Sequence, residues 1–202
     1  MRIAIVGAGR VGRTLGARWN TAGHDTVYGV RDPSDTRYAE LGSRAIPADA
    51  VQEADVVLVA LPWGAVEAIL GGIDVADAVV IDATNALAAG APELQGHPEL
   101  SGAQLVAKWA RSSHVIKGFN TTGAGNMADS TYPGGTPVML LAGDDADAKA
   151  VVSSLATEIG FDAVDAGTLA AARDLEHLAT IWIRLAYSLG QGPGIAFALL
   201  RR

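Results

Sequence analysis

The chain has 202 residues, of which 50% are hydrophobic and 18% charged, so it is long enough for one domain, or for one domain with a small second lobe. Acidic residues (22) outnumber lysine and arginine (15), and the formal charge of −7 argues against general binding to nucleic acid. Cysteine is absent, which excludes disulfides, thiolate metal sites and cysteine nucleophiles.

Apolar strands and helices alternate from the amino terminus to about residue 120. The runs that predict strands cover residues 3–6, 25–30, 55–61, 78–83 and 114–119. The helices predicted between them cover a segment that ends near Gly23 and residues 63–70 and 104–110. A short helix after Pro33 is expected to be capped by Asp32 or Ser34. This alternation predicts an α/β fold with a Rossmann-like, doubly wound parallel sheet.

The pattern continues toward the carboxy terminus with a strand near residues 137–141, a helix near 146–159 and a strand near 161–164. The last segment differs, because large apolar side chains recur there at spacings of 3 and 4: Leu175, Leu178, Trp182, Leu185 and Leu189. Such a broad apolar face needs cover on more than one side. The segment is expected either to pack into a small carboxy-terminal helical lobe or to form a subunit interface.

A glycine motif of the form G-x-G-x-x-G lies between the first predicted strand and the first predicted helix. Its residues are Gly7, Ala8, Gly9, Arg10, Val11 and Gly12. In this position the glycines allow a tight turn, a close approach of backbone to a pyrophosphate, and close contact between helix and strand. The helix amino terminus adds unpaired N–H groups. The motif therefore predicts dinucleotide binding, and all six residues are candidates to contact the cofactor.

The type of dinucleotide depends on the residues after the second predicted strand. Enzymes specific for NAD usually place Asp or Glu there to accept the ribose hydroxyls. This chain has Val30 at that place, and the next residue, Arg31, has a guanidinium that could bind a 2′-phosphate, with Ser34 as a further donor. This arrangement favours NADP(H). If the register shifts by two residues, Asp32 becomes the ribose acceptor and the cofactor is NAD.

Later strand ends carry further candidates, because ligands of open parallel sheets bind beyond the carboxyl ends of the strands. One such end has the small or apolar residues Ala60, Leu61 and Pro62, followed by Trp63, which could cover a ring. Short polar side chains follow two other strands: Thr84, Asn85, Asn120 and Thr121. These groups could bind a carboxamide or a second ring. The alternative is that they cap the next helix or turn.

Several motifs occur together in a distinctive order. After the glycine motif come Tyr28-Gly29-Val30-Arg31-Asp32-Pro33, Asp82-Ala83-Thr84-Asn85, Lys117-Gly118-Phe119-Asn120-Thr121, and Ala172-Arg173-Asp174-Leu175-Glu176 with Trp182. In this combination, which covers essentially the whole chain, the sequence resembles the NADPH-dependent reductase family typified by the F420H2:NADP oxidoreductase.

The resemblance implies an NADP-binding Rossmann domain over residues 1–142, a small lobe over residues 143–202 that could form a dimer, and a homodimer. It also implies hydride transfer between the nicotinamide of NADP(H) and a deazaflavin, coenzyme F420, as co-substrate, or a flavin-like acceptor. Carried over by position, Arg31 contacts the 2′-phosphate, and the four polar strand-end residues lie near the stacked rings. The family often has Ser just before this Arg, where this chain has Val30, so one phosphate hydrogen bond is lost.

Hydride transfer between two rings needs no protein nucleophile, so we assign no catalytic residue. Lys117 and Asn120 have the spacing of a Lys and Asn pair in hydroxyacid dehydrogenases, but that pair lies on a helix, and residues three apart at a strand end point to opposite faces. The four histidines are dispersed, so no metal site is expected. Of these, His97 is the one that could approach the site, if its loop covers it.

The sequence leaves two other functions open. One is an NADPH-dependent ferric or quinone-type reductase, and the other is a non-catalytic module that senses the NADP(H) ratio. The expected partner is a small-molecule redox acceptor, and a membrane is not expected because the longest apolar runs are too short to cross a bilayer. The glycine motif begins at residue 7, which leaves no room for a signal peptide, so a cytoplasmic protein is expected.

Overall fold

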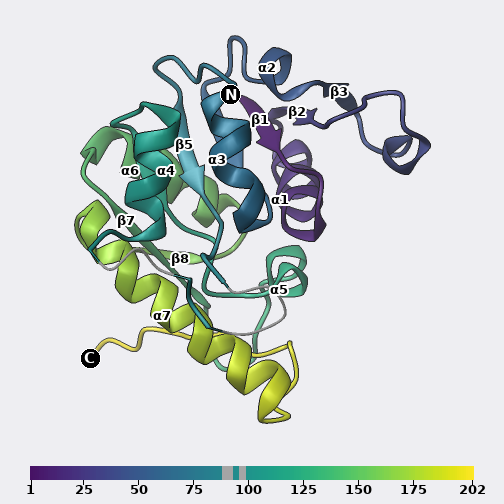
Figure 1. Ribbon diagram of the computed structural model, residues 1–202. Coiled ribbons are helices and arrows are strands. Elements are labelled where there is room, and N and C mark those ends of the chain that lie inside the picture. The colour runs from purple at the N-terminus through teal and green to yellow at the C-terminus, as the bar shows by residue number, and fades with distance from the viewer. Residues whose placement is uncertain (88–92, 96–98) are drawn as a thin grey trace.

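The computed structural model describes residues 1–87, 93–95 and 99–202. Within them one sheet has the strand order β3-β2-β1-β4-β5-β6-β7-β8 (Figure 1). Its strands are β1 (Arg2–Val6), β2 (Asp25–Gly29), β3 (Ser43–Ala45), β4 (Val56–Val59), β5 (Val79–Asp82), β6 (Val115–Lys117), β7 (Val138–Gly143) and β8 (Asp162–Asp165). The α-helices are α1 (Arg10–Thr21), α2 (Pro47–Ala50), α3 (Trp63–Gly71), α4 (Gly102–Ala110), α5 (Ala124–Ala128), α6 (Ala146–Glu158) and α7 (Ala172–Ile183).

The sheet order confirms the Rossmann-like α/β fold. Neighbouring strands from β3 to β6 are parallel, and the chain crosses from β2 and β3 over β1 to β4, which creates the switch in strand order where such sheets bind ligands. The pair β6 and β7 is antiparallel, whereas β7 and β8 are parallel to each other. The sheet is therefore mixed rather than parallel throughout.

The two faces of the sheet bury separate apolar cores. On one face Trp19 of α1 packs with Leu155 of α6, and the indole Nε1–H donates to the Leu155 carbonyl at 3.1 Å. On the other face Val66 of α3, Val106 of α4 and Leu175 of α7 belong to the second core. Figure 1 shows α3 and α4 in front of the strands, and α7 crossing beyond their lower ends. Burial on both faces explains why the strands are apolar throughout.

The carboxy-terminal part extends the sheet before it forms a lobe. Only Ala142 and Gly143 of β7 pair with β6, so most of β7, with β8, projects past the carboxyl ends of the parallel strands. The chain then enters the 3-10 helix η2 (Leu169–Ala171), α7 and a π-helical turn, η3 (Arg184–Ser188). The division expected between residues 142 and 143 therefore falls at the end of a strand, and α6 and β8 continue the same sheet and core.

Some local features differ from those expected. The short helix after Pro33 is the 3-10 helix η1 (Thr36–Tyr38), and its cap is Asp35, whose Oδ1 accepts from the Arg37 N–H at 2.9 Å. The expected caps, Asp32 and Ser34, bond to each other instead, so that prediction was wrong. β3, α2 and α5 were not predicted. Among the described residues, no helix is both long and apolar enough to span a bilayer.

Candidate cofactor-binding site

The glycine loop joins β1 to α1 and has the geometry of a phosphate cradle. Gly7 has φ +110°, and a Cβ there would lie 2.4 Å from the Ala60 carbonyl oxygen. A Cβ at Gly12 would lie 2.0 Å from the Gly7 carbonyl oxygen, so α1 can pack this closely on the loop only with glycine there. A Cβ at Gly9, the N-cap of α1, would have no atom within 4 Å. Gly7 and Gly12 thus allow backbone segments to pack closely, and Gly9 leaves open space at the amino terminus of α1.

A pocket of ≈ 460 Å³ lies over this loop. It brings together the glycine loop, Arg31 and the end of β4, and the predicted residues that line it are Gly7, Ala8, Gly9, Arg31, Ala60, Leu61 and Pro62. Tyr38, Pro47, Ala65 and Ile69 also line it and were not predicted. Tyr38 is the one aromatic side chain in the polar stretch after β2, which is a signal that sequence alone offers. An apolar wall, a ring and a guanidinium at a phosphate cradle suit a phosphorylated dinucleotide.

The residues after β2 separate the two cofactor alternatives. Val30 and Arg31 line the pocket, whereas Asp32 and Ser34 are not among its lining residues. Asp32 Oδ1 accepts from the Ser34 N–H at 2.9 Å and from the Ser34 hydroxyl at 2.6 Å, and these bonds hold the pKa of Asp32 below its usual value. The guanidinium of Arg31 is therefore better placed than the carboxylate of Asp32 to contact a ligand in this pocket. Ser34 donates to Asp32 rather than toward the pocket.

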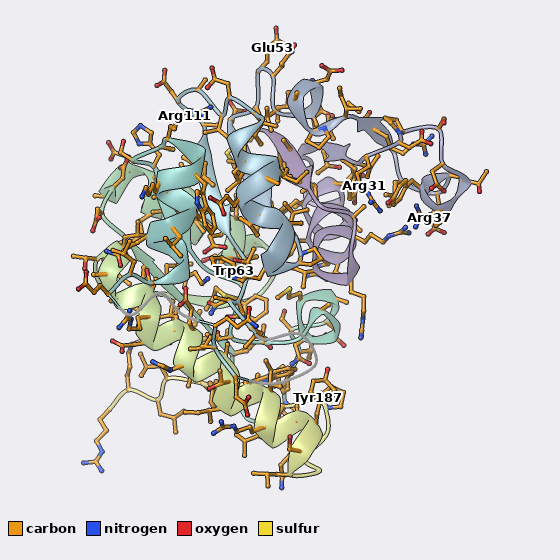
Figure 2. The ribbon with its side chains drawn as sticks, in the orientation of Figure 1. Arg31, Arg37, Glu53, Trp63, Arg111 and Tyr187 are labelled. Carbon is orange, nitrogen blue, oxygen red and sulfur yellow. The ribbon has the colours of Figure 1, made fainter. Side chains whose placement is uncertain are left out.

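A second pocket of ≈ 450 Å³ lies at the next residues of the glycine motif. Arg10 and Val11, both predicted to bind the cofactor, line this second pocket, together with the start of α5 and the segment after α7. Tyr187, 61% exposed, contributes its ring. Figure 2 shows Tyr187 beside the last turns of the carboxy-terminal helix, far from the Arg31 end of the molecule. Consecutive residues of the glycine motif thus line two pockets.

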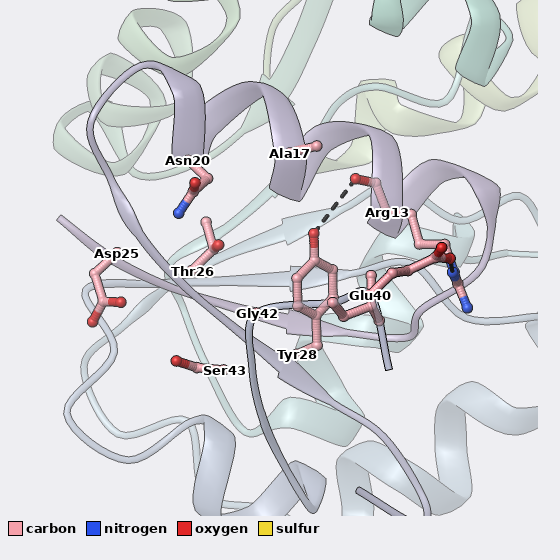
Figure 3. Close-up of a pocket in the computed structure, with 10 residues that line it drawn as sticks. Arg13, Ala17, Asn20, Asp25, Thr26, Tyr28, Glu40, Gly42 and Ser43 are labelled. Carbon is pink, nitrogen blue, oxygen red and sulfur yellow. Dashed lines mark hydrogen bonds and ion pairs between the residues drawn. The ribbon is translucent and has the colours of Figure 1, made fainter. Parts of the chain in front are cut away.

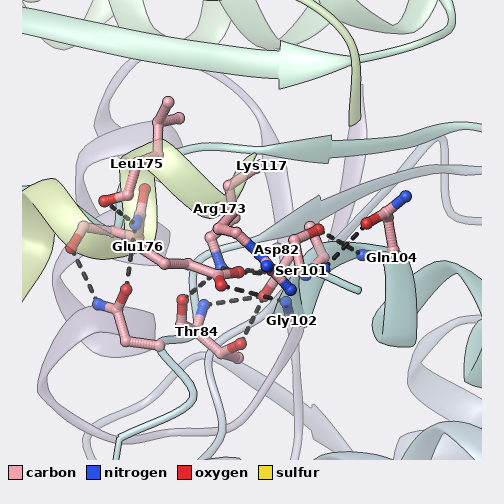
Figure 4. A network of polar contacts seen from close by, with 12 residues as sticks. Asp82, Thr84, Ser101, Gly102, Gln104, Lys117, Arg173, Leu175 and Glu176 are labelled. Atoms are coloured by element: carbon pink, nitrogen blue, oxygen red, sulfur yellow. Dashed lines mark hydrogen bonds and ion pairs between the residues drawn. The ribbon is translucent and has the colours of Figure 1, made fainter. Parts of the chain in front are cut away.

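The polar residues after β5 and β6 form a buried network (Figure 4). The Lys117 ammonium donates to Asp82 Oδ2 at 2.9 Å and to the Thr84 carbonyl at 2.6 Å, and it lies 3.2 Å from Glu176 Oε1. Glu176 in turn accepts the N–H groups of Gly102 and Ala103, at the start of α4. The network ties β5, β6, α4 and α7 together at the carboxyl edge of the sheet.

Thr84, Asn85 and Asn120 come together in this network, as their strand-end positions predicted, but none lines the pocket over the glycine loop. The Thr84 hydroxyl donates to Asp82 Oδ1 at 2.7 Å. The Asn120 amide donates to Asn85 Oδ1 and to the Leu175 carbonyl, both at 3.1 Å. Their side-chain donors thus bond to Asp82, to each other and to α7, and these bonds are not the caps of a following helix or turn that the alternative expected. Their contact with a ligand stays a prediction, as does that of Thr121, which is buried.

Glu176 was named in a sequence motif but was given no role of its own. Glu176 is 4% exposed and lies on the apolar stripe of α7, and a charged residue on a buried stripe is a signal that the sequence does offer. Trp63 packs against Trp109 of α4 with ring centroids 5.3 Å apart, and neither pocket includes it. Its contact with a substrate ring stays a prediction. His97 lies outside the described residues.

Comparisons with known proteins agree with this geometry. Residues 2–86 match the family model described as NADP oxidoreductase coenzyme F420-dependent. The chain is 30% identical over 207 residues to the F420-dependent NADP reductase of Methanothermobacter marburgensis, and the match covers 92% of each chain. A crystal structure from Arthrobacter sp. FB24, of a protein assigned as an F420-dependent NADP-reductase, has 28% identity and a TM-score of 0.86 over 100% of both chains.

A second kind of relative is also similar. The metalloreductase STEAP3 of Rattus norvegicus is 29% identical over 180 residues, which is 88% of this chain and 36% of that protein. The chain therefore spans about a third of the length of this relative.

Proposed function

Because the chain belongs to the F420-dependent NADP oxidoreductase family, we propose that this NADP-dependent oxidoreductase transfers hydride between the nicotinamide and coenzyme F420 or another flavin-like acceptor. The observation that supports this most strongly is the pocket in which the glycine loop, Arg31 and the apolar end of β4 meet. In this proposal the backbone N–H groups at the start of α1 bind the pyrophosphate, and Arg31 binds the 2′-phosphate.

The residues present fit such a cofactor. The open space at Gly9 allows a phosphate to approach the backbone, and Ala60, Leu61 and Pro62 offer an apolar wall without charge. Tyr38 supplies a ring at the Arg31 end of the same pocket. When bound, the nicotinamide supplies or accepts the hydride. The work of the protein is to hold the cofactor, to orient it and to keep water out, which needs no catalytic acid or base.

The second pocket is our candidate for the acceptor. It adjoins the glycine loop at Arg10 and Val11, its lining is largely apolar and small, and Tyr187 offers a ring against which a flat acceptor can stack. The lobe built by α7 and η3 would then form one wall of the acceptor site.

The experiment is a coenzyme titration followed by an acceptor screen. Calorimetry with NADPH and NADH measures binding, and absorbance at the nicotinamide band measures turnover with oxidised F420, flavins, quinones and ferric chelates. We expect binding that favours NADPH, and turnover with a deazaflavin or flavin. Absence of binding to either coenzyme would overturn the proposal.

The similarity to a metalloreductase favours ferric chelates as a second candidate acceptor. Turnover with ferric chelates alone would support it. Tight NADPH binding without turnover by any acceptor would instead support the NADP(H)-sensing alternative.

We also propose that the protein acts as a cytoplasmic homodimer. Apolar side chains of α7 and the turn after it are exposed, among them Ile181 (49%) and Leu189 (67%), and a second copy would bury them. Sedimentation of the protein with and without NADPH would measure this. A monomer under both conditions would contradict it.

A further inference from the structure

The segment 31–43, called here the 31–43 loop, carries two residues of the cofactor pocket, Arg31 and Tyr38. Between Arg31 and Gly42 its only regular structure is the three-residue helix η1, and Ser43 is the first residue of β3. Figure 2 shows Arg31 and Arg37 on this loop, beside α1 and away from the body of the molecule. Contacts with other parts of the protein must therefore hold this loop in position relative to the glycine loop.

Arg13, in the first turn of α1, joins the two loops. Its Nε–H donates to the Ala8 carbonyl of the glycine loop at 2.9 Å. Its two terminal nitrogens reach the 31–43 loop, where Nη2 donates to the Arg37 carbonyl at 2.8 Å and Nη1 donates to Glu40 Oε1 at 2.5 Å. The guanidinium carbon also lies 5.7 Å from the centre of the Tyr38 ring. Every nitrogen of this guanidinium is thus used, on two segments at once.

A space behind the 31–43 loop makes the bonds of Arg13 important for the position of that loop. A pocket of ≈ 450 Å³ lies between α1, β2 and the residues from Glu40 to Ser43, and Arg13 and Glu40 stand together at one end of it (Figure 3). Side chains do not fill this space, so the residues from Glu40 to Ser43 gain little from packing on α1 and β2. From the β3 side, Arg44 holds the loop by donating to the Leu41 carbonyl at 2.9 Å. Tyr38 and Leu41 are the loop residues that pack against the core, and both are only partly buried.

We propose that Arg13 is a positioning residue for the selection of the 2′-phosphate, an inference that rests on the proposed function. By tying the Arg37–Glu40 segment to Ala8, Arg13 fixes Arg31 and Tyr38 at a set distance from the pyrophosphate cradle. A preorganised cationic site binds a phosphate more tightly than one that must be ordered on binding. NADH has no 2′-phosphate, so its affinity depends less on this order.

Two variants separate a bridge from a simple positive charge. Arg13→Gln removes the charge and most of the bridge. Arg13→Lys keeps the charge, but one ammonium on a flexible stem cannot reproduce the planar fork that spans the two loops. The matched control is Arg18→Gln, on the same helix, because Arg18 also donates to two backbone carbonyls, those of Ala128 at 3.0 Å and Ile159 at 3.2 Å. Arg18 touches neither loop.

The measurement is the dissociation constant of NADPH and of NADH for each folded variant, with thermal unfolding as the check on folding. We expect both Arg13 variants to lower the preference for NADPH over NADH by about tenfold. Arg18→Gln should keep the wild-type preference, even where its unfolding temperature falls as much.

Three results would overturn the inference. The first is an unchanged preference in both Arg13 variants, the second is full recovery of the preference in Arg13→Lys, and the third is an equal loss in Arg18→Gln. Failure of the proposed function looks different, because the wild-type protein would then bind neither coenzyme. A wild type that binds NADPH and NADH equally would also overturn the inference, because no selection would exist for Arg13 to support.

Discussion

The ammonium of Lys117 lies 2.9 Å from Asp82 Oδ2, and neither side chain has exposed surface. Glu176 adds a second carboxylate 3.2 Å from the same ammonium, with 5% of its side chain exposed. A buried charge is tolerated only when its partners are in place, because loss of one partner leaves the others without water or counterion. This network joins the last residues of two strands to α7, so it holds the carboxy-terminal lobe against the sheet.

Replacement of Lys117 should therefore destabilise the whole protein. We expect Lys117→Met to lower the free energy of unfolding by about 3–5 kcal/mol, measured by urea denaturation. Lys108→Met, at an exposed position of α4, is the control and should change it by no more than about 0.5 kcal/mol. If Lys117→Met does not fold, the double variant Lys117→Met/Asp82→Asn should recover folding. Equal unfolding midpoints for the two single lysine variants would contradict the prediction.

The guanidinium of Arg31 should select NADPH. A hydrogen bond to a charged group contributes about 1.5–3 kcal/mol, which corresponds to a factor of about 10 to 100 in binding. Arg31→Ala is therefore expected to raise KM for NADPH by about that factor and to change KM for NADH by less than about threefold. Steady-state kinetics with both coenzymes checks this. Asp32→Asn is the matched control, and a larger rise in KM for NADH with this variant would show that Asp32 binds the ribose.

Substitution of Gly9 should weaken cofactor binding, whereas substitution of Gly12 should lower stability. Gly9→Ala places a methyl group in open space, so the protein should fold with unchanged stability but bind NADPH at least about tenfold more weakly, because the methyl group occupies the approach to the backbone. Gly12→Ala places its methyl group 2.0 Å from the Gly7 carbonyl oxygen, so it should lower the unfolding temperature. Thermal unfolding and NADPH titration of both variants measure this. Normal NADPH binding by Gly9→Ala would argue against the cradle.

Stability should fall at acid pH partly through Asp145, which caps α6. Its pKa lies below the usual value, first because His114 bonds to its side chain and then because the Ala148 N–H donates to it. A carboxyl with a lowered folded-state pKa adds stability that is complete above its unfolded pKa of about 3.9 and disappears as the pH falls through the folded-state value. Unfolding temperatures between pH 7 and pH 3 should therefore drop less steeply for Asp145→Asn, which keeps a capping side chain. Parallel curves for the two proteins would refute this.

Sequence predicted the parts of the fold that long apolar runs specify. β1, β4 and β5 are buried throughout or nearly so, and their runs could be read without ambiguity. β3 has three residues, none of them buried, and forms only by pairing with β2, so nothing local indicates it. The direction of β7 was also out of reach, because hydrophobic pattern identifies a strand without giving its orientation.

For the candidate site too, sequence predicted only what local spacing determines. The glycine loop and Arg31 have spacings fixed by the β1–α1–β2 unit, so their meeting in one pocket could be predicted. Thr84 and Asn120 were correctly placed at the strand ends. Whether a side chain there faces a ligand or bonds to another protein group, such as the Asp82 carboxylate or the Leu175 carbonyl, depends on rotamers and on α7, which comes from much later in the chain. The place of Tyr38 in the pocket and the bonds of Arg13 to Arg37 and Glu40 both depend on the course of the irregular 31–43 loop. The sequence does not specify that course.

The projection of β7 and β8 past the parallel strands has a mechanical consequence. Because β7 and β8 belong to the same hydrogen-bonded sheet as β1, which leads into the glycine loop, we expect the two parts to move as one body. We therefore expect a coenzyme to enter and leave without rotation of two halves about a hinge. Entry and exit of a coenzyme must instead rely on short peripheral segments, and slow release, if observed, should respond to changes in those segments rather than to changes at the strand crossover.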